Sequence, residues 1–211
     1  MRILAVSDIV DPSLYDHFDP VRWESAGVDL LISCGDLPAD YLSYLVSRFN
    51  VPLFYVPGNH DESYREAPPE GAESIDGRLI VWHQLRILGL GGSAWYNGGY
   101  GQYRDWMMRL RVLRLTPWIW HAGGIDLIVT HAPPAYPPPV VGGAGRAEPA
   151  ALARSDRVHR GFPVFTELIH AYHPRALLHG HTHLGYGTRK RVIEIEGTRV
   201  VDVYGHYLLE L

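Results

Sequence analysis

Five short apolar runs along the chain share one feature: each ends in Asp, Asn or His, in most cases beside Gly or Pro. The runs are rich in β-branched residues or leucine and lack a clear period, which is typical of strands buried on both faces. They lie at residues 3–6, 28–32, 53–56, 125–129 and 176–178. Ligands bind at the carboxyl ends of parallel strands in α/β sheets. We therefore expect the five following loops to converge on one place.

Other segments predict the elements that connect or extend these strands. Residues 38–49, 102–115 and 163–172 are helical in pattern, with apolar side chains recurring on one face of the first. Residues 78–92 are apolar and broken by glycine, which indicates a hairpin, and the alternating tail 189–211 predicts a β-meander. The strands are therefore mixed, some joined by helices and some by tight turns.

The stretch 132–149 is rich in Pro and Gly and is the strongest candidate for a linker. We interpret it as a long loop instead of a linker between domains. The polar residues at 179–183 lie beyond it, and they can complete a site only together with residues from the first half of the chain. The sequence contains no repeat. We predict one α/β domain over residues 1–211.

The composition is that of an ordinary globular protein. The 211 residues are 46% apolar and 20% charged, with a net charge of -4, and no basic stripe suggests a dedicated nucleic-acid surface. No apolar run reaches the roughly 18 residues that span a membrane, and the N-terminal run stops at Asp8 without a signal-peptide pattern. One cysteine, Cys34, cannot form an internal disulfide. We expect a cytoplasmic protein.

The polar residues at the strand ends form a set suited to metal chemistry. Carboxylates, imidazoles and one amide favour divalent ions such as Mn, Fe, Zn or Co. The set is too large for one tetrahedral site and suits two ions that share a carboxylate, an arrangement that serves phosphoryl transfer. Its members are Asp8, Asp36, Asn59, His60, His131, His181 and His183.

The order of these blocks resembles the calcineurin-like metallophosphoesterase superfamily. The blocks are SD at 7–8, GD at 35–36, GNHD at 58–61, TH at 130–131 and GHTH at 180–183. GNHD followed by GHTH at this separation is a specific signal, and the resemblance runs from residue 3 to about 185. It implies two packed mixed β-sheets flanked by helices, with a dimetal centre on the strand-end loops.

The resemblance also implies a role for each residue. Asp36 would bridge two divalent ions, such as Mn, Fe or Zn. His60 would not bind metal but would contact the phosphate and protonate the leaving oxygen, after attack by a metal-bound hydroxide. The first ion would be held by Asp8, His183 and Asp36, and the second by Asp36, Asn59, His131 and His181.

The chain departs from the family pattern at its first block. The family has Asp-x-His, whereas this chain has Asp8, Ile9 and then Val10, whose side chain cannot bind a metal. Asp11 could act as a surrogate ligand, water could fill the position, or only one ion could bind tightly. A fourth alternative is that catalysis has been lost.

Two further residues are candidates for substrate binding. His159 precedes a helix and resembles a His-x-Gly segment that lines the phosphate pocket in some relatives. Arg104 lies at the end of an aromatic loop, residues 93–106, which could stack a base or sugar or could pack against the core.

We predict a metal-dependent phosphoesterase, and a phosphodiesterase in particular, that acts on a small phosphate ester. One alternative is a degenerate phosphate- or nucleotide-binding protein with an incomplete first metal site at Val10. Another is a nuclease subunit whose loop 132–149 docks a partner. A homo-oligomer is also compatible with the exposed aromatic residues that we expect.

Overall fold

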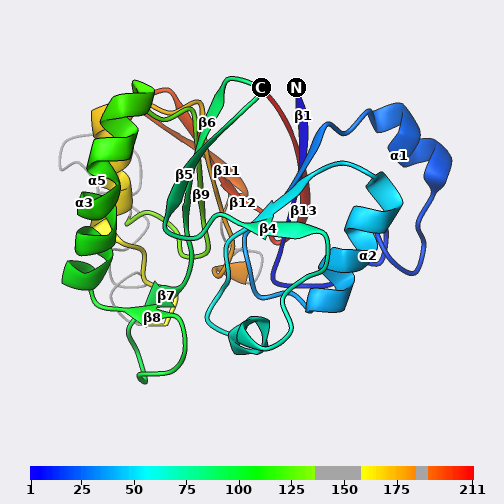
Figure 1. Cartoon of the computed structure of the whole chain (residues 1–211), viewed down its shortest axis with the longest axis horizontal. Coiled ribbons are helices and arrows are strands. Elements are labelled where there is room, and N and C mark those ends of the chain that lie inside the picture. The colour runs from blue at the N-terminus through cyan, green and yellow to red at the C-terminus, as the bar shows by residue number, and fades with distance from the viewer. Residues whose placement is uncertain (136–157, 184–189) are drawn as a thin grey trace, which may run out of the picture.

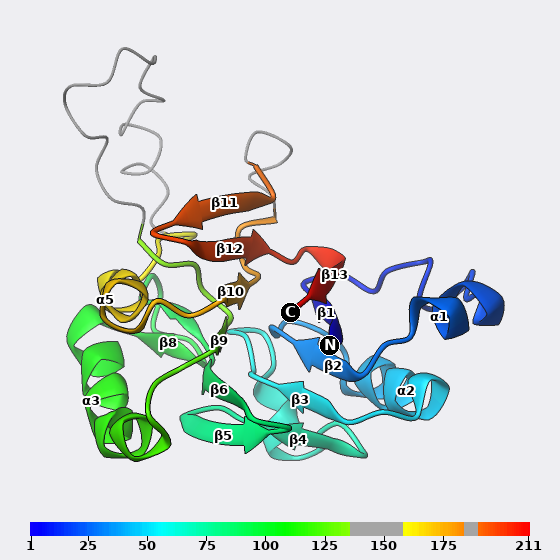
Figure 2. The same ribbon diagram turned by 90° about the horizontal axis from the view of Figure 1, so that it is seen from above.

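The computed structural model describes residues 1–135, 158–183 and 190–211 of the chain. Two β-sheets lie face to face, and helices cover the outer face of each sheet (Figure 1). Figure 2 shows the resulting four layers from above. The prediction of an α/β fold with two packed mixed sheets flanked by helices is confirmed.

The first sheet carries the N-terminal strands and has the order β13-β1-β2-β3-β4. Its strands are parallel except β13, which pairs antiparallel with β1 at one edge. Two helices cover its outer face, and a short 3-10 helix, η1, follows β3. The bounds are β1 Arg2–Ser7, α1 Pro20–Ala26, β2 Leu30–Ser33, α2 Ala39–Phe49, β3 Leu53–Tyr55, η1 Glu62–Arg65, β4 Ala72–Ser74 and β13 Gly205–Glu210.

The second sheet has the order β11-β12-β10-β9-β6-β5, with parallel strands at its centre and an antiparallel pair at each edge. Helices α3 and α5 cover its outer face, and the short strands β7 and β8 pair beside it. The bounds are β5 Arg78–Trp82, β6 Leu85–Leu90, β7 Ser93–Ala94, β8 Gln102–Tyr103, α3 Asp105–Ala122, β9 Leu127–Thr130, α5 Pro163–Tyr172, β10 Ala176–His179, β11 Val192–Ile195 and β12 Thr198–Asp202.

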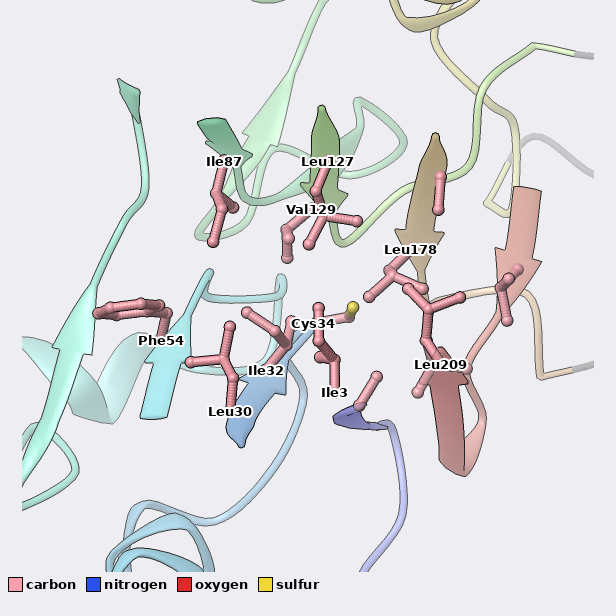
Figure 3. Close-up of a cluster of buried hydrophobic side chains, with 14 of the residues drawn as sticks. Ile3, Leu30, Ile32, Cys34, Phe54, Ile87, Leu127, Val129, Leu178 and Leu209 are labelled. Carbon is pink, nitrogen blue, oxygen red and sulfur yellow. The ribbon is translucent and has the colours of Figure 1, made fainter. Parts of the chain in front are cut away.

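The two sheets are held together by apolar side chains from their inner faces (Figure 3). Ile32 and Cys34 of the first sheet lie opposite Val129 and Leu178 of the second, and all four are fully buried. Burial of apolar area contributes about 25 cal/mol per Å². Because both sheets supply this core, the strand ends of the two sheets are fixed relative to each other.

Several predicted elements are confirmed, and one helix prediction is wrong at both ends. The hairpin β5–β6 and helix α5 lie where the pattern placed them, and α2 begins one residue later than predicted, after Pro38. Residues 102–103 are not helical but form β8, and α3 continues past Pro117 to Ala122. The helix survives the proline because Ile119, one half-turn later, is fully buried in the core beneath α3 and α5.

The prediction of a C-terminal meander is also wrong. Strands β11 and β12 form the expected hairpin, but β13 crosses to the other sheet and pairs with β1. The crossing occurs at Gly205, which adopts φ +79°, a left-handed conformation that favours glycine. The crossing brings the chain ends together, and the Met1 amino group donates a hydrogen bond of 3.0 Å to the Leu211 carbonyl.

The loop predicted at 132–149 lies largely outside the described residues. Within the described part, residues 132–135 continue from β9, and Pro134 bridges to Phe162 at the start of α5. No helix in the described ranges is long and apolar enough to cross a membrane.

Candidate metal centre

The loops after β1, β2, β3, β9 and β10 meet at one edge of the two sheets. Hydrogen bonds between sheets hold them there. The His181 amide donates to Asp8 Oδ1 at 2.9 Å, and His131 Nδ1 donates to the Cys34 carbonyl at 2.8 Å. The convergence expected from the apolar runs therefore arises from direct contacts between the two sheets.

Glycine permits two of these loops to approach so closely. A Cβ atom at Gly58 would overlap the Asp36 carboxylate, and one at Gly180 would overlap Ser7 and Asp8. The glycines of GNHD and GHTH are therefore required by the close approach of neighbouring loops.

Four of the six predicted metal ligands have a strained backbone. Left-handed conformations are uncommon for residues with a side chain, and strain of this kind is concentrated at functional sites. The φ angles are +68° at Asp8, +56° at Asp36, +68° at His181 and +47° at His183. The fold therefore holds the backbone of these four residues in a conformation that residues with a side chain disfavour.

Asp36, His131 and His181 form a compact cluster that could hold a metal ion. One ligand atom from each lies within 4.8 Å of those of the other two. His131 Nε2 lies 3.2 Å from Asp36 Oδ2, and the His131 side chain is fully buried. These three residues are called the compact half of the centre below.

Hydrogen bonds leave one ring nitrogen of each histidine in the compact half available as a ligand. His131 donates its Nδ1 proton to the Cys34 carbonyl, which leaves Nε2 facing Asp36. His181 donates its Nε2 proton to the Val158 carbonyl at 2.8 Å, which leaves Nδ1. A metal-binding histidine usually donates its second nitrogen to such a carbonyl.

The electrostatics of the compact half differ from residue to residue. Burial acts against a charged His131, but Asp36, Asp8 and the Cys34 carbonyl together outweigh it and raise the pKa of His131 to about 9. Burial also acts against a charged Asp36, yet His131 and the His60 amide lower the pKa of Asp36 to about 2. Burial and nearby His131 lower the pKa of His181 to about 3. A metal ion would therefore meet a ready carboxylate and a neutral His181, and would displace the proton of His131.

Buried polar atoms without a hydrogen-bond partner provide a test of whether a metal fits. Such atoms are costly and rare, so each needs an explanation. Within residues 1–135, 158–183 and 190–211, two of them belong to predicted ligands, Asp8 Oδ2 and Asn59 Oδ1. The buried His131 Nε2 is close to Asp36 Oδ2, at 3.2 Å, but does not form a well-aligned hydrogen bond with it. Carboxylate oxygen, amide oxygen and imidazole nitrogen are suitable donors for Mn, Fe or Zn. The residues present therefore fit a divalent metal.

The other half of the centre, Asp8 with His183, is less complete and is called the open half below. His183 Nε2 lies 3.6 Å from Asp8 Oδ1, and the His183 side chain is 36% exposed. The Val10 side chain is partly buried and packs against the apolar cluster under α1 and α2. The loop thus turns position 10 toward the core.

Asp11, the predicted surrogate ligand, is engaged by other partners. Its Oδ1 accepts hydrogen bonds from the Ser13 amide at 2.9 Å and the Ser13 hydroxyl at 2.7 Å. Its Oδ2 pairs with His206 Nδ1 at 2.6 Å. Both oxygens would have to leave these partners before Asp11 could bind a metal.

The three residues predicted to act on substrate lie in different surroundings. His60 is exposed, and its amide donates to Asp36 Oδ1 at 2.9 Å, which places its backbone beside the compact half. The ring centre of His159 lies 5.2 Å from that of His181 and 5.6 Å from that of His183. Arg104 stacks over Trp95 at 5.1 Å and has no described contact with a predicted ligand.

Sequence analysis missed the role of Asp61, although it quoted the GNHD block that contains it. Asp61 Oδ2 accepts hydrogen bonds of 2.7 Å from the amides of both Asp36 and Gly58. Burial raises the pKa of Asp61 to about 6. The side chain ties the loop of Asp36 to the loop of Asn59, so its role is to orient ligands.

Comparison with known proteins identifies the fold and the family. The crystal structure of TT1561 of Thermus thermophilus has a TM-score of 0.62 and 17% identity, over 97% of this chain and 89% of its own. A second solved structure has a TM-score of 0.62 and 15% identity, over 97% and 90%. Identities this low support the fold alone, and no curated protein matches. A model of the calcineurin-like phosphoesterases covers residues 1–185, and the chain therefore belongs to the calcineurin-like phosphoesterase family.

Proposed function

We propose that this chain is a metal-dependent phosphodiesterase that hydrolyses a small phosphate diester at the sheet-edge centre. The observation that carries the proposal is the buried cluster of Asp36, His131 and His181, whose ligand atoms lie within 4.8 Å of one another. Family membership supports hydrolysis of a phosphoester, and the cluster supports the involvement of a divalent metal.

Two ions would be held unequally. The compact half, with Asn59, would hold one, and Asp8 with His183 and the shared Asp36 would hold the other. Bound divalent ions supply positive charge beside the phosphorus and lower the pKa of water. Mn²⁺ suits the mixture of oxygen and nitrogen donors.

Residues outside the ligand set would act on the substrate. His60 is exposed while its backbone is fixed to Asp36, so its imidazole can reach a phosphate and give a proton to the leaving oxygen. His159 contacts the rings of His181 and His183 and would line the phosphate pocket.

The charge around the centre favours a diester over a monoester. Within the described ranges, the hydrogen-bond and ion-pair partners of Asp36, His131 and His181 include no Arg or Lys side chain. A monoester carries about two negative charges near neutral pH, and binding it would call for cations such as Arg. A diester carries a single charge and needs fewer of them.

Hydrolysis of two chromogenic esters tests the proposal. The purified chain is stripped with a chelator, reloaded with Mn²⁺, and assayed with bis(p-nitrophenyl) phosphate and p-nitrophenyl phosphate. We expect turnover that depends on Mn²⁺ and is faster with the diester. Faster turnover of the monoester would overturn the choice of substrate class. A chain that binds Mn²⁺ but turns over neither ester would favour the degenerate binding protein.

A further inference from the structure

The orientation of the buried Asn59 side chain needs an explanation from outside its own loop. Its side chain is 7% exposed, and its Oδ1 is buried without a hydrogen-bond partner among the described residues. An amide offers an oxygen on one side and an NH₂ group on the other, and only the oxygen can bind a cation. Some other group must hold the amide so that this oxygen faces the centre.

Tyr96 provides that contact from a loop remote in sequence. Asn59 Nδ2 donates a hydrogen bond of 3.3 Å to the Tyr96 hydroxyl, which anchors the end of the amide opposite Oδ1. Donation from the NH₂ group also polarises the amide and makes its oxygen a better ligand, as outer partners do for other metal ligands.

The loop that carries Tyr96 is itself well fixed. Gln102 is 6% exposed, and its Oε1 accepts hydrogen bonds from the amides of Tyr96, Asn97 and Gly98 at 3.1, 3.1 and 3.0 Å. Its Nε2 donates to Asn97 Oδ1 at 2.6 Å. One buried side chain thus sets the backbone on which Tyr96 stands.

The same loop is in close contact with the loop of Asn59. A Cβ atom at Gly101 would lie 3.0 Å from the Gly58 carbonyl oxygen and 3.3 Å from Asn59 Cα. Gly101 adopts φ +63°, so a larger residue would be strained there as well. The loop of residues 96–102 therefore supports the GNHD block on its outer side.

We propose that Tyr96 is a positioning residue for the metal centre, acting through Asn59. The inference rests on the proposed function, because it takes Asn59 as a ligand. Tyr96 does not touch the metal; its hydroxyl holds the Asn59 amide with Oδ1 directed at the ion. Loss of an outer partner of this kind lowers metal affinity by roughly 10–100-fold.

The test is Mn²⁺ affinity of the full chain by calorimetric titration, for wild type, Tyr96→Phe, Asn59→Ala and the double variant. Tyr100→Phe is the matched control, because it removes a hydroxyl from the same loop while keeping a ring that stacks with Arg65 at 4.9 Å. We expect Tyr96→Phe to weaken Mn²⁺ binding by about 10-fold or more and Tyr100→Phe to leave it unchanged. In the Asn59→Ala background, Tyr96→Phe should have no further effect.

Thermal unfolding of each metal-free variant shows whether it remains folded. Should Tyr96→Phe unfold, Tyr96→Leu, which also removes the hydroxyl that accepts from Asn59, takes its place in the same cycle. Wild-type affinity in Tyr96→Phe, or equal losses with and without Asn59, would overturn the inference while leaving the proposed function intact. Failure of the wild-type chain itself to bind Mn²⁺ would overturn both.

Discussion

The compact half and the open half of the metal centre differ in how many ligands the fold delivers. The compact half brings Asp36, His131 and His181 together from both sheets, with their ligand atoms within 4.8 Å of one another. In the open half, His183 stands 3.6 Å from Asp8, and its side chain is 36% exposed. The compact half is therefore arranged before any metal arrives, whereas the open half is only partly assembled.

The difference shows how one loop can change a shared site. The ligands of the compact half follow β2, β9 and β10. The open half depends on the loop after β1, where Val10 packs into the core beneath α1 and α2. Because Asp36 would serve both ions, damage to the compact half should affect the whole centre, whereas damage to the open half should affect one ion.

The largest effect is expected from His131→Ala. This change removes a buried ligand and leaves Asp36 without its partner at 3.2 Å. We expect turnover of the diester to fall by more than about 100-fold, beyond the loss seen for outer partners of a metal. Turnover and Mn²⁺ per chain measure the effect, and His17→Ala, at an exposed histidine, serves as control. Retained metal with retained turnover would remove the compact half from the mechanism.

A smaller and more selective effect is expected from His183→Ala. His183 lies in the open half, so its loss should remove the weaker ion and leave the compact half filled. Elemental analysis after loading with Mn²⁺ should fall by about one ion per chain, with turnover reduced roughly 10–100-fold. Loss of both ions would mean that the two halves do not bind independently.

Asp61→Ala should act on the compact half without removing a ligand. Two backbone amides, at Asp36 and Gly58, would lose the acceptor they share at 2.7 Å. We expect Mn²⁺ affinity to fall about 10-fold and the free energy of unfolding to fall by about 1–3 kcal/mol. Asp61→Asn keeps an acceptor oxygen and should lose less on both measures. Equal losses in the two variants would show that the charge, not the hydrogen bonds, is what matters.

Val10→His gives the smallest effect and bears directly on the open half. The side chain at this position packs against the cluster under α1 and α2, so an imidazole there would be partly buried against apolar side chains. We expect no gain in Mn²⁺ per chain and a loss of about 1–3 kcal/mol in the free energy of unfolding. A gain of one tightly bound ion would show instead that position 10 can turn into the site.

Local sequence patterns predicted most strands and the convergence of the strand ends, because buried strands and their polar ends are local features. The ends of helix α3 and the partner of strand β13 were predicted wrongly, because both depend on distant contacts. Burial of Ile119 carries α3 past Pro117, and β13 pairs with β1 at the opposite end of the chain. The residues near each element in the sequence do not indicate these distant contacts.

The candidate site shows the same difference between local patterns, which the sequence reveals, and distant contacts, which it does not. The six predicted ligands stand in recognisable blocks, and the structure brings Asp36, His131 and His181 into one cluster. The packing of Val10 against the apolar cluster under α1 and α2, and the pairing of Asp11 with His206, depend on how one loop folds, and the sequence did not reveal them. Tyr96 was also hidden, because its link to Asn59 joins residues 37 positions apart.

Calorimetric titration of the metal-free wild-type chain with Mn²⁺ tests the central claim most directly. The account predicts two phases: one ion bound tightly by the compact half and a second bound more weakly by the open half. The tight phase should disappear in His131→Ala, and the weak phase in His183→Ala. No binding, or two ions bound with equal affinity, would contradict the account.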